Sequence, residues 1–327
     1  MEKFKAYRIY EDGGKVGGRF VELALDELDP GEVTIKTAYA SVNYKDALAA
    51  TGAGKVIRRF PCIGGIDAAG SVAASSDPRF KAGDPVIAHG FGLGVSHDGG
   101  YSGYVRAPGD WVIPLPAGIS VIDAGTLGVA GYTAAQAIHV LELNGLKPAS
   151  GKVLVNGATG GCGSIGIDML SRLGYHVVAL TGKDAEHGYL KELGAAEVLS
   201  RQKLEMGKRP LEKSMWAAAL DSVGGEQLAW LTRTMQENGL IASFGNAGGI
   251  ELNTTVLPFI LRGVRLLGIS SDSPRALREA VWKRIASDLK PRHLERIRRV
   301  AAFDELPDLF RKTLQAQIRG RSVVRIP

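Results

Sequence analysis

The sequence contains little cysteine, no long apolar run and no continuous basic arm, and each absence excludes a class of protein. Its two cysteines, Cys62 and Cys162, are too few for a disulfide framework or a four-cysteine zinc site. No segment reaches the ~18 consecutive apolar residues of a membrane-spanning helix, and the charged N-terminus lacks the apolar core of a signal peptide. We therefore expect reduced thiols and a cytoplasmic protein with no membrane partner.

The excess of basic residues is small. The net charge is +6, and the basic residues are dispersed, without the interleaved aromatic residues of a surface that stacks nucleic-acid bases. We therefore expect a small-molecule substrate and no nucleic acid. The 327 residues, of which 45% are hydrophobic and 23% charged, are enough for two globular domains of ordinary composition.

Residues 1–122 are dominated by strand-like patterns. Apolar and polar side chains alternate over residues 4–10 and 33–42, and glycine-containing turns separate these segments from their neighbours. Short strands joined by such turns predict a barrel-like β domain.

The pattern changes to helices alternating with strands over residues 123–271. Residues 123–144 have helical spacing, and six apolar strand segments then alternate with helical ones. The six segments are 153–155, 176–180, 197–199, 216–221, 240–244 and 264–269. This order predicts an α/β fold with a doubly wound parallel sheet. Residues 272–327 contain two helical patterns and a last strand, and we expect them to return to the first domain.

A glycine-rich turn follows the first of these strands. Val153-Leu-Val-Asn-Gly-Ala-Thr-Gly-Gly-Cys-Gly-Ser-Ile-Gly166 contains Ala158-x-Gly160-x-x-Gly163, a variant of the dinucleotide-binding fingerprint. Glycines let the backbone approach a pyrophosphate, and the helix that begins near Gly163 offers free N–H groups and a partial positive charge. The sequence therefore predicts a dinucleotide site in this turn.

The end of the second strand indicates which dinucleotide. An NAD site usually places a carboxylate ~20 residues after the glycines, on the ribose 2′-hydroxyl. Here Thr181, Gly182 and Lys183 follow the strand, and Arg201 follows the third strand. A hydroxyl, an ammonium and a planar guanidinium suit a 2′-phosphate. The sequence therefore predicts NADPH.

Several motifs together resemble one family. Gly128-Val-Ala-Gly-Tyr-Thr-Ala134 and the turn at 158–163 resemble the medium-chain dehydrogenase/reductase superfamily. Ser41-Val-Asn-Tyr-Lys-Asp46, Gly65-Ile-Asp-Ala-Ala-Gly70 and Pro258-Phe-Ile-Leu-Arg-Gly-Val-Arg265 resemble its acrylyl-CoA reductase branch, which is also described as quinone-oxidoreductase-like. The resemblance implies a GroES-like catalytic domain in two pieces, a Rossmann domain between them, and commonly a homodimer.

The resemblance also implies an activity and a set of contacts. It implies NADPH-dependent reduction of an activated C=C bond. The residues that it implies for NADPH are Tyr44, Ala158, Thr159, Gly160, Gly161, Cys162, Gly163, Thr181, Gly182, Lys183, Arg201, Asn246, Ile260 and Ser271. Zinc-using relatives carry Gly-His-Glu where this chain has Gly65-Ile66-Asp67, so we expect no metal.

Without a metal, the carbonyl oxygen of an enoyl thioester substrate needs hydrogen-bond donors, and the α-carbon of that substrate needs a proton. Tyr44 is the candidate proton donor or enolate stabiliser, near a strand end, and Asn43 and Asp46 are candidates for orienting it or the nicotinamide ribose. The alternative is that Tyr44 only packs on the cofactor and that solvent supplies the proton. His89 and His97 are interpreted as turn or loop histidines, and both cysteines as packing residues.

Two groups of basic residues are candidates for the phosphates of CoA. One consists of Lys55, Arg58 and Arg59, and the other of Lys290, Arg292, Arg296, Arg298 and Arg299. An NADPH:quinone reductase of the same fold is the alternative enzyme. An NADPH-binding sensor or RNA-binding protein, as found among crystallin-like relatives, is the alternative of a different class. Residues 264–269 are a candidate edge strand for dimerisation.

Overall fold

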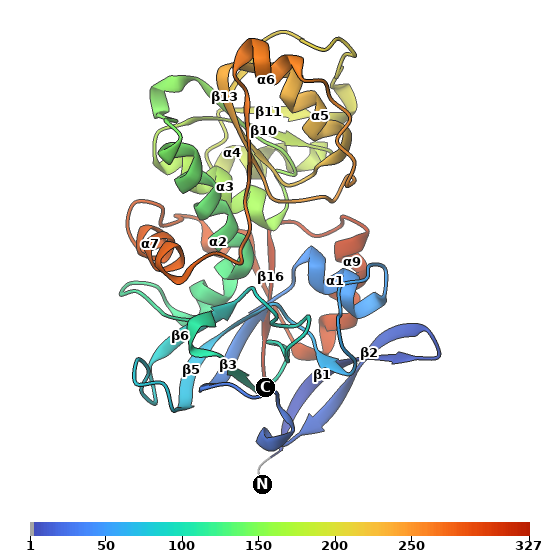
Figure 1. The fold of residues 1–327 in the computed structure, drawn as a ribbon, viewed down its shortest axis with the longest axis vertical. Coiled ribbons are helices and arrows are strands. Elements are labelled where there is room, and N and C mark those ends of the chain that lie inside the picture. The colour runs from blue at the N-terminus through green and yellow to red at the C-terminus, as the bar shows by residue number, and fades with distance from the viewer. Residues whose placement is uncertain (1–2) are drawn as a thin grey trace. The chain divides into compact units, whose positions relative to one another are not determined.

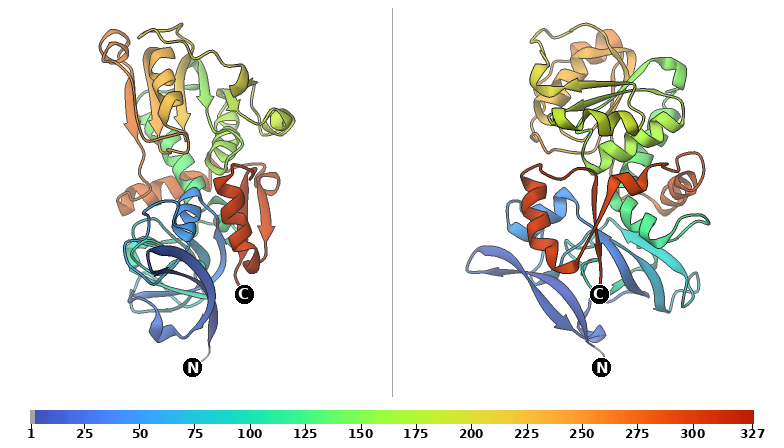
Figure 2. Two further views of the ribbon diagram at one scale, coloured as in Figure 1. Left: turned by 90° about the vertical axis from the view of Figure 1, so that its right-hand side faces the viewer. Right: turned by 180° about the vertical axis from the view of Figure 1, so that it is seen from behind.

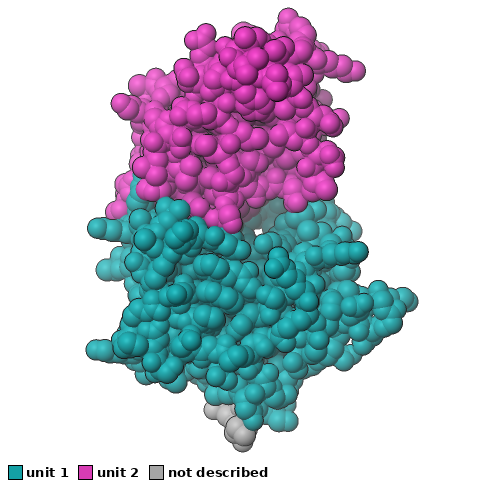
Figure 3. All heavy atoms as spheres, in the orientation of Figure 1, with its two compact units in different colours: residues 1–130, 271–286, 294–327 teal, residues 131–270, 287–293 magenta. Residues whose placement is uncertain are grey.

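The computed structural model describes residues 3–327 and divides the chain into two compact units, coloured separately in Figure 3. Unit 1 contains residues up to 130, 271–286 and 294–327, and unit 2 contains residues 131–270 and 287–293. The first division therefore falls after Ala130, inside a helix, whereas the composition change suggested residue 122. The short segment 287–293 belongs to unit 2 although its neighbours on both sides belong to unit 1.

Unit 1 is built around a seven-stranded sheet whose order is β15-β16-β3-β5-β6-β8, with β7 also paired to β3 (Figure 1). Its strands are β3 (Val33–Ser41), β5 (Asp67–Ser75), β6 (Pro85–His89), β7 (Tyr104–Ala107), β8 (Val112–Pro114), β15 (Arg298–Ala301) and β16 (Arg321–Arg325). The last strand, β16, lies antiparallel to β3, so the end of the chain joins the sheet formed by its beginning.

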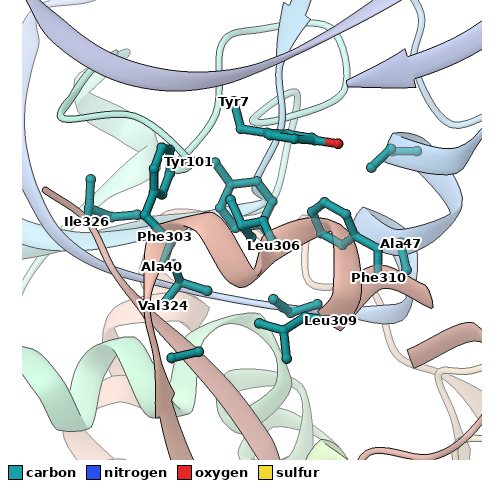
Figure 4. Close-up of a cluster of buried hydrophobic side chains, with 14 of the residues drawn as sticks. Tyr7, Ala40, Ala47, Tyr101, Phe303, Leu306, Leu309, Phe310, Val324 and Ile326 are labelled. Atoms are coloured by element: carbon teal, nitrogen blue, oxygen red, sulfur yellow. The ribbon is translucent and has the colours of Figure 1, made fainter. Parts of the chain in front are cut away.

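A second, three-stranded sheet has the order β2-β1-β4, from β1 (Phe4–Asp12), β2 (Lys15–Leu23) and β4 (Cys62–Ile63). An apolar cluster joins it to two helices, α1 (Tyr44–Thr51) and α9 (Leu306–Leu314), and to strands of the larger sheet. Figure 4 shows Tyr7, Tyr101 and Phe310 packed in this cluster, where neighbouring ring centroids lie 5.6 and 5.7 Å apart. Helices α7 (Arg275–Ile285) and α8 (Leu294–Ile297) complete unit 1.

Unit 2 contains six parallel strands in the order β11-β10-β9-β12-β13-β14, with helices on both faces (Figures 1 and 2). The strands are β9 (Lys152–Val155), β10 (His176–Thr181), β11 (Glu197–Ser200), β12 (Trp216–Asp221), β13 (Met235–Ser243) and β14 (Arg265–Gly268). The order in which strands are added reverses at β9 and β12, because β10 and β11 extend the sheet on one side and β13 and β14 on the other. Ligands of such sheets bind at this switch point. The predicted doubly wound parallel sheet is confirmed.

The helices of unit 2 are α3 (Gly161–Arg172), α4 (His187–Glu192), α5 (Gly225–Thr234) and α6 (Leu257–Arg262). Helix α2 (Val121–Leu143) begins in unit 1 and ends in unit 2, and its regular geometry is broken at Gly128. The sequence patterns did not predict α1 or α6 as helices. None of the helices within residues 3–327 is long and apolar enough to cross a membrane.

Candidate functional site

The glycine-rich turn lies at the carboxyl end of β9, beside the point where the strand order reverses. Gly160 is the N-cap of α3, which begins at Gly161, close to the start predicted near Gly163. A Cβ added to Gly163 would lie 2.5 Å from the carbonyl oxygen of Gly157, so this glycine allows the helix to pack closely on the turn. A Cβ on Gly160 would have only that same oxygen within contact range, at 3.2 Å. Gly160 is therefore little crowded by the rest of the chain.

The end of β10 carries the side chains predicted for a 2′-phosphate. The N–H of Lys183 donates to Thr181 Oγ1 at 3.0 Å, which bends the chain sharply at Gly182. The Arg201 guanidinium lies against Gly182, because an added Cβ there would be 2.9 Å from Nη2. Gln202 Nε2 donates to the Gly182 carbonyl at 2.6 Å and keeps the two strand ends together. Thr181, Gly182 and Arg201 therefore lie together.

A buried carboxylate that sequence reasoning missed fixes the neighbouring strand ends. Asp221, at the end of β12, is fully buried and accepts hydrogen bonds from Asn156 Nδ2 at 2.6 Å and Ser243 Oγ at 2.9 Å. It also accepts the N–H groups of Val223 and Gly224. Asn156 follows β9, Val223 and Gly224 follow β12, and Ser243 is the last residue of β13. Asp221 therefore holds together the carboxyl ends of these three strands. Its place at the end of a predicted strand was the available signal.

The remaining predicted cofactor contacts are divided between the units. Asn246 is exposed in the loop after β13, and Tyr44 and Ser271 belong to unit 1. Ile260 lies on α6, whose Arg262 donates to the carbonyls of Arg233 and Met235 at the amino end of β13. The structure therefore places Ile260 toward the amino ends of the strands, whereas the glycine-rich turn lies at their carboxyl ends. The side chain of Ile260 is 68% exposed.

In unit 1, the predicted catalytic residues lie at the start of α1. Asn43 is the N-cap residue, and the Asp46 carboxylate accepts its N–H at 2.9 Å, which is the reciprocal half of a capping box. Tyr44 is therefore the first residue of a helix and lies shortly after the end of β3 at Ser41, near a strand end as predicted, and its side chain is 38% exposed. The Asn-x-x-Asp spacing was a capping signal that could have predicted this helix.

Asp46 is almost completely buried and accepts three hydrogen bonds. Its donors are the N–H and Nδ2 of Asn43, and the N–H of Ile66 at 3.0 Å. Burial, together with the nearby charge of Asp67, raises the pKa of Asp46 from 3.8 to about 7. A carboxyl group in such surroundings changes its protonation state near neutral pH. Asp67, Ser41 and Arg321 join the same network, and none of them was a predicted site residue.

Neither histidine belongs to a ligand cluster. His89 ends β6, is fully buried, and accepts the Trp282 Nε1–H at 3.0 Å. It is a core residue of a strand, so the interpretation as a turn histidine was wrong. His97 contacts the carbonyl oxygens of Pro30 and Asp98. Within residues 3–327, no group of three or more His, Cys, Asp or Glu side chains is placed to hold a metal ion.

The cysteines and the basic clusters differ in their surroundings. Burial raises the pKa of the Cys62 thiol to about 12, while Cys162 is half-buried in α3.

Most arginines of the two basic groups form ion pairs. Arg59 pairs with Asp29. In the second group, Arg292 pairs with Asp168, Arg298 with Asp123, and Arg299 with Glu305. Lys55 and Arg58 are exposed, and the described residues provide no ion-pair partner for either. This leaves the loop after α1 as the less neutralised of the two groups.

Comparison with known proteins agrees with this architecture. Residues 29–117 match the alcohol dehydrogenase GroES-like domain, and residues 161–287 match the zinc-binding dehydrogenase family model. YhfP of Bacillus subtilis, named as a quinone oxidoreductase, is 47% identical over 99% of both chains. The acrylyl-CoA reductase AcuI of Ruegeria pomeroyi is 44% identical over 97% of this chain and 96% of its own.

The solved structures of such relatives contain nicotinamide dinucleotides. Escherichia coli YhdH with bound NADPH superimposes with a TM-score of 0.95, at 42% identity over 98% of this chain and 100% of its own. Bacillus subtilis YhfP, with NAD bound, gives a TM-score of 0.96 at 46% identity over the full length of both chains. With its GroES-like domain and its doubly wound sheet, the chain belongs to the medium-chain dehydrogenase/reductase superfamily of oxidoreductases.

Proposed function

We propose that the chain is an NADPH-dependent reductase of the activated C=C bond of acrylyl-CoA, producing propionyl-CoA without zinc. The observation that carries the cofactor assignment is the Arg201 guanidinium held against Gly182, next to the glycine-rich turn. A fixed cation in this position favours a 2′-phosphate, and β10 ends without a carboxylate at its tip. The name of the 44% identical relative from Ruegeria pomeroyi, an acrylyl-CoA reductase, supports the choice of acceptor.

The residues of each unit have distinct tasks in this proposal. NADPH supplies the hydride that adds to the β-carbon of the enoyl thioester. The N–H groups at the start of α3 hold the pyrophosphate, and Thr181, Lys183 and Arg201 hold the 2′-phosphate. In unit 1, the hydroxyl of Tyr44 donates a proton to the α-carbon, and Asn43 fixes the helix start from which Tyr44 projects.

The acceptor is tested by following NADPH oxidation with acrylyl-CoA, crotonyl-CoA and a quinone in parallel. We expect the highest kcat/KM with acrylyl-CoA. The second candidate function is a quinone reductase, which the name of the 47% identical relative YhfP favours. A kcat/KM that is higher with the quinone would establish that candidate and exclude the first.

Tyr44→Phe tests the proton donor. Because the change removes one hydroxyl and keeps the ring, kcat should fall much more than NADPH affinity, by about 10²-fold or more for loss of a general acid. NADPH affinity is measured by fluorescence titration and kcat at saturating substrate. A change confined to the KM for NADPH would assign the proton to solvent and leave Tyr44 as a packing residue.

Lys55 and Arg58 are proposed to meet the phosphates of CoA. The double variant Lys55→Ala/Arg58→Ala should raise the KM for acrylyl-CoA and leave kinetics with an uncharged quinone unchanged, since only CoA carries phosphates. Lys290→Ala is the matched control from the other basic group. An equal KM for acrylyl-CoA in the double variant and the parent would show that the loop after α1 does not bind the phosphates of CoA.

Zinc independence is proposed from the ligand pattern, because Ile66 and Asp67 stand where zinc-using relatives carry His and Glu. Activity should survive dialysis against a chelator, with no zinc detected by metal analysis of the purified protein. Loss of activity that added zinc restores would refute this part of the proposal.

A homodimer is proposed through the edge of the sheet in unit 2. Among the described residues, strand β14 is paired only with β13, so one side of its backbone remains available for pairing. In the segment between β13 and β14, Ile250, Val256, Ile260 and Leu261 are 81%, 65%, 68% and 61% exposed, which is unusual for large apolar side chains. Light scattering should give twice the mass of the chain, and Ile260→Glu should weaken the association. A monomer at micromolar concentration would exclude it.

A further inference from the structure

A buried ion pair in unit 1 contacts Asn43, one of the predicted catalytic residues at the start of α1. Asp67, the first residue of β5, is 1% exposed, and Arg321, the first residue of β16, is 3% exposed. Arg321 Nη2 lies 3.9 Å from Asp67 Oδ2. Buried charges are costly unless every polar atom is satisfied, so the partners of these two side chains indicate what the pair holds in place.

The Arg321 guanidinium binds two separate parts of the chain. Its Nε donates to the carbonyl of Thr126 at 3.0 Å, inside α2. Its Nη1 donates to Asn43 Oδ1 at 3.0 Å and to the Val42 carbonyl at 3.3 Å. Its Nη2 donates to Ser41 Oγ. A planar fork of donors suits this arrangement, whereas the point charge of a lysine does not.

The Asp67 carboxylate binds the same segments from the other side. Its Oδ1 accepts the Ser41 N–H at 2.7 Å, and its Oδ2 accepts Ser41 Oγ at 2.5 Å and Asn43 Nδ2 at 3.1 Å. Its Oδ2 also accepts the Val129 N–H at 3.1 Å. That contact needs the break in α2 at Gly128, where φ is +46° and an added Cβ would collide with Asp67 Oδ2.

The consequence is that the side chain of Asn43 has one allowed orientation. Its oxygen faces Arg321, and its nitrogen donates to Asp67 at 3.1 Å and to Asp46 at 3.0 Å. A reversed amide would place donors against the guanidinium and an acceptor against two carboxylates. Because Asn43 is the N-cap of α1, its fixed orientation also fixes the backbone from which Tyr44 emerges.

We propose that Asp67 and Arg321 are positioning residues that act through Asn43 to hold Tyr44 for proton transfer. This role rests on the proposed function, since it concerns the same proton donor. Neither side chain touches the substrate in this proposal. Its prediction is that disturbing the pair lowers turnover far more than it weakens NADPH binding, because the glycine-rich turn and Arg201 belong to unit 2.

Arg321→Lys is the main test variant, and Arg278→Lys is its matched control. Arg278 is also a fully buried guanidinium of unit 1, and it donates to the carbonyls of His89 and Trp111. We expect kcat with acrylyl-CoA to fall about 10- to 100-fold in Arg321→Lys, as small displacements of reacting groups do. The dissociation constant for NADPH should stay within about twofold, as the pair does not bind it. Arg278→Lys should lower thermal stability and retain kcat.

Ser41→Ala provides a milder variant in case Arg321→Lys does not fold. It removes the hydroxyl that bridges the two ions and keeps both charges. We expect an intermediate fall in kcat, again with NADPH affinity retained. Unchanged kcat per folded molecule in Ser41→Ala and Arg321→Lys would overturn the positioning role, as would an equal fall in Arg278→Lys.

The two proposals fail in different ways. If the parent protein reduces a quinone and no enoyl-CoA, the choice of acceptor fails, and the same variants measured with the quinone should retain kcat, because proton transfer to an α-carbon is then absent. If the parent reduces acrylyl-CoA and the variants keep its kcat, only the positioning role fails. A parent that reduces no acceptor overturns both.

Discussion

Replacement of His89 should change how the stability of the protein depends on pH. His89 Nε2 accepts the Trp282 N–H at 3.0 Å, so its proton is on Nδ1. Protonation would place a second N–H against that donor, inside the core and near the Arg278 guanidinium. Burial, with that charge as the second cause, lowers the pKa of His89 well below 6.5. The folded state therefore binds no proton here under conditions in which the unfolded chain does.

The sign and size of the effect follow from proton linkage. Below pH 6.5 the unfolded chain gains a proton at His89 and the folded protein does not, so this group makes the free energy of unfolding fall as pH falls. One proton corresponds to about 1.4 kcal/mol per pH unit. At pH 5 the contribution of His89 is therefore about 2 kcal/mol less favourable than at pH 7.5.

His89→Gln removes this titration while keeping an acceptor for Trp282. Urea unfolding is followed by circular dichroism at pH 5.0, 6.0 and 7.5, beside the parent and His187→Gln, which removes a half-buried imidazole instead. The difference in unfolding free energy between His89→Gln and the parent should move by about 2 kcal/mol in favour of the variant between pH 7.5 and 5. A difference that stays constant across this range would refute the reasoning.

Asp46 makes the free energy of unfolding depend on pH in the opposite direction. Its pKa is raised to about 7, so the folded protein keeps a proton that the unfolded chain loses from about pH 4 upward. The free energy of unfolding from this group therefore falls as pH rises from about 4 to about 7. The two slopes oppose one another below pH 6.5 in the parent. His89→Gln should expose the slope of Asp46, so that the variant becomes more stable toward acid over this window.

Three further substitutions test the cofactor site. Gly163→Ala places a Cβ 2.5 Å from the Gly157 carbonyl oxygen, so NADPH affinity in a fluorescence titration should fall about tenfold or more, with an unchanged dichroism spectrum. Arg201→Ala should weaken NADPH binding about 10- to 100-fold and leave NADH binding unchanged, as expected for loss of a charge-assisted hydrogen bond. Asp221→Ala leaves four donors without their acceptor, and the unfolding free energy should fall by about 2–4 kcal/mol in urea.

The parts of the fold that the sequence predicted are those with local signals. The strands of unit 2 are short apolar runs bounded by turns, and the glycine spacing from Ala158 to Gly163 identifies where the first one ends. Helix α1 was missed because residues 44–51 are short and rich in alanine, without a periodic apolar face. Its capping pair, Asn43 and Asp46, was present in the sequence and was assigned a catalytic meaning only.

The parts that could not be predicted depend on contacts between distant segments. In the sequence, Arg321 is one basic residue among many, next to the last predicted strand. Only the pairing of β16 with β3 brings it to Asn43. His89 is followed by a glycine and a loop, which suggested a turn or loop histidine, yet it is buried in β6 against Trp282 of α7. In both cases the chemistry of the side chain is set by an element at the other end of the chain.

The pair formed by Asp67 and Arg321 is therefore more informative about function than about stability. A buried ion pair can often be replaced by apolar residues with little loss of stability or even a gain, so stability alone is a weak reason for having one here. Apolar side chains cannot distinguish the oxygen of a side-chain amide from its nitrogen. The arrangement around Asn43, with a cation at its oxygen and carboxylates at its nitrogen, makes that distinction. A fixed amide at the start of α1 is what the proposed role of Tyr44 as proton donor requires.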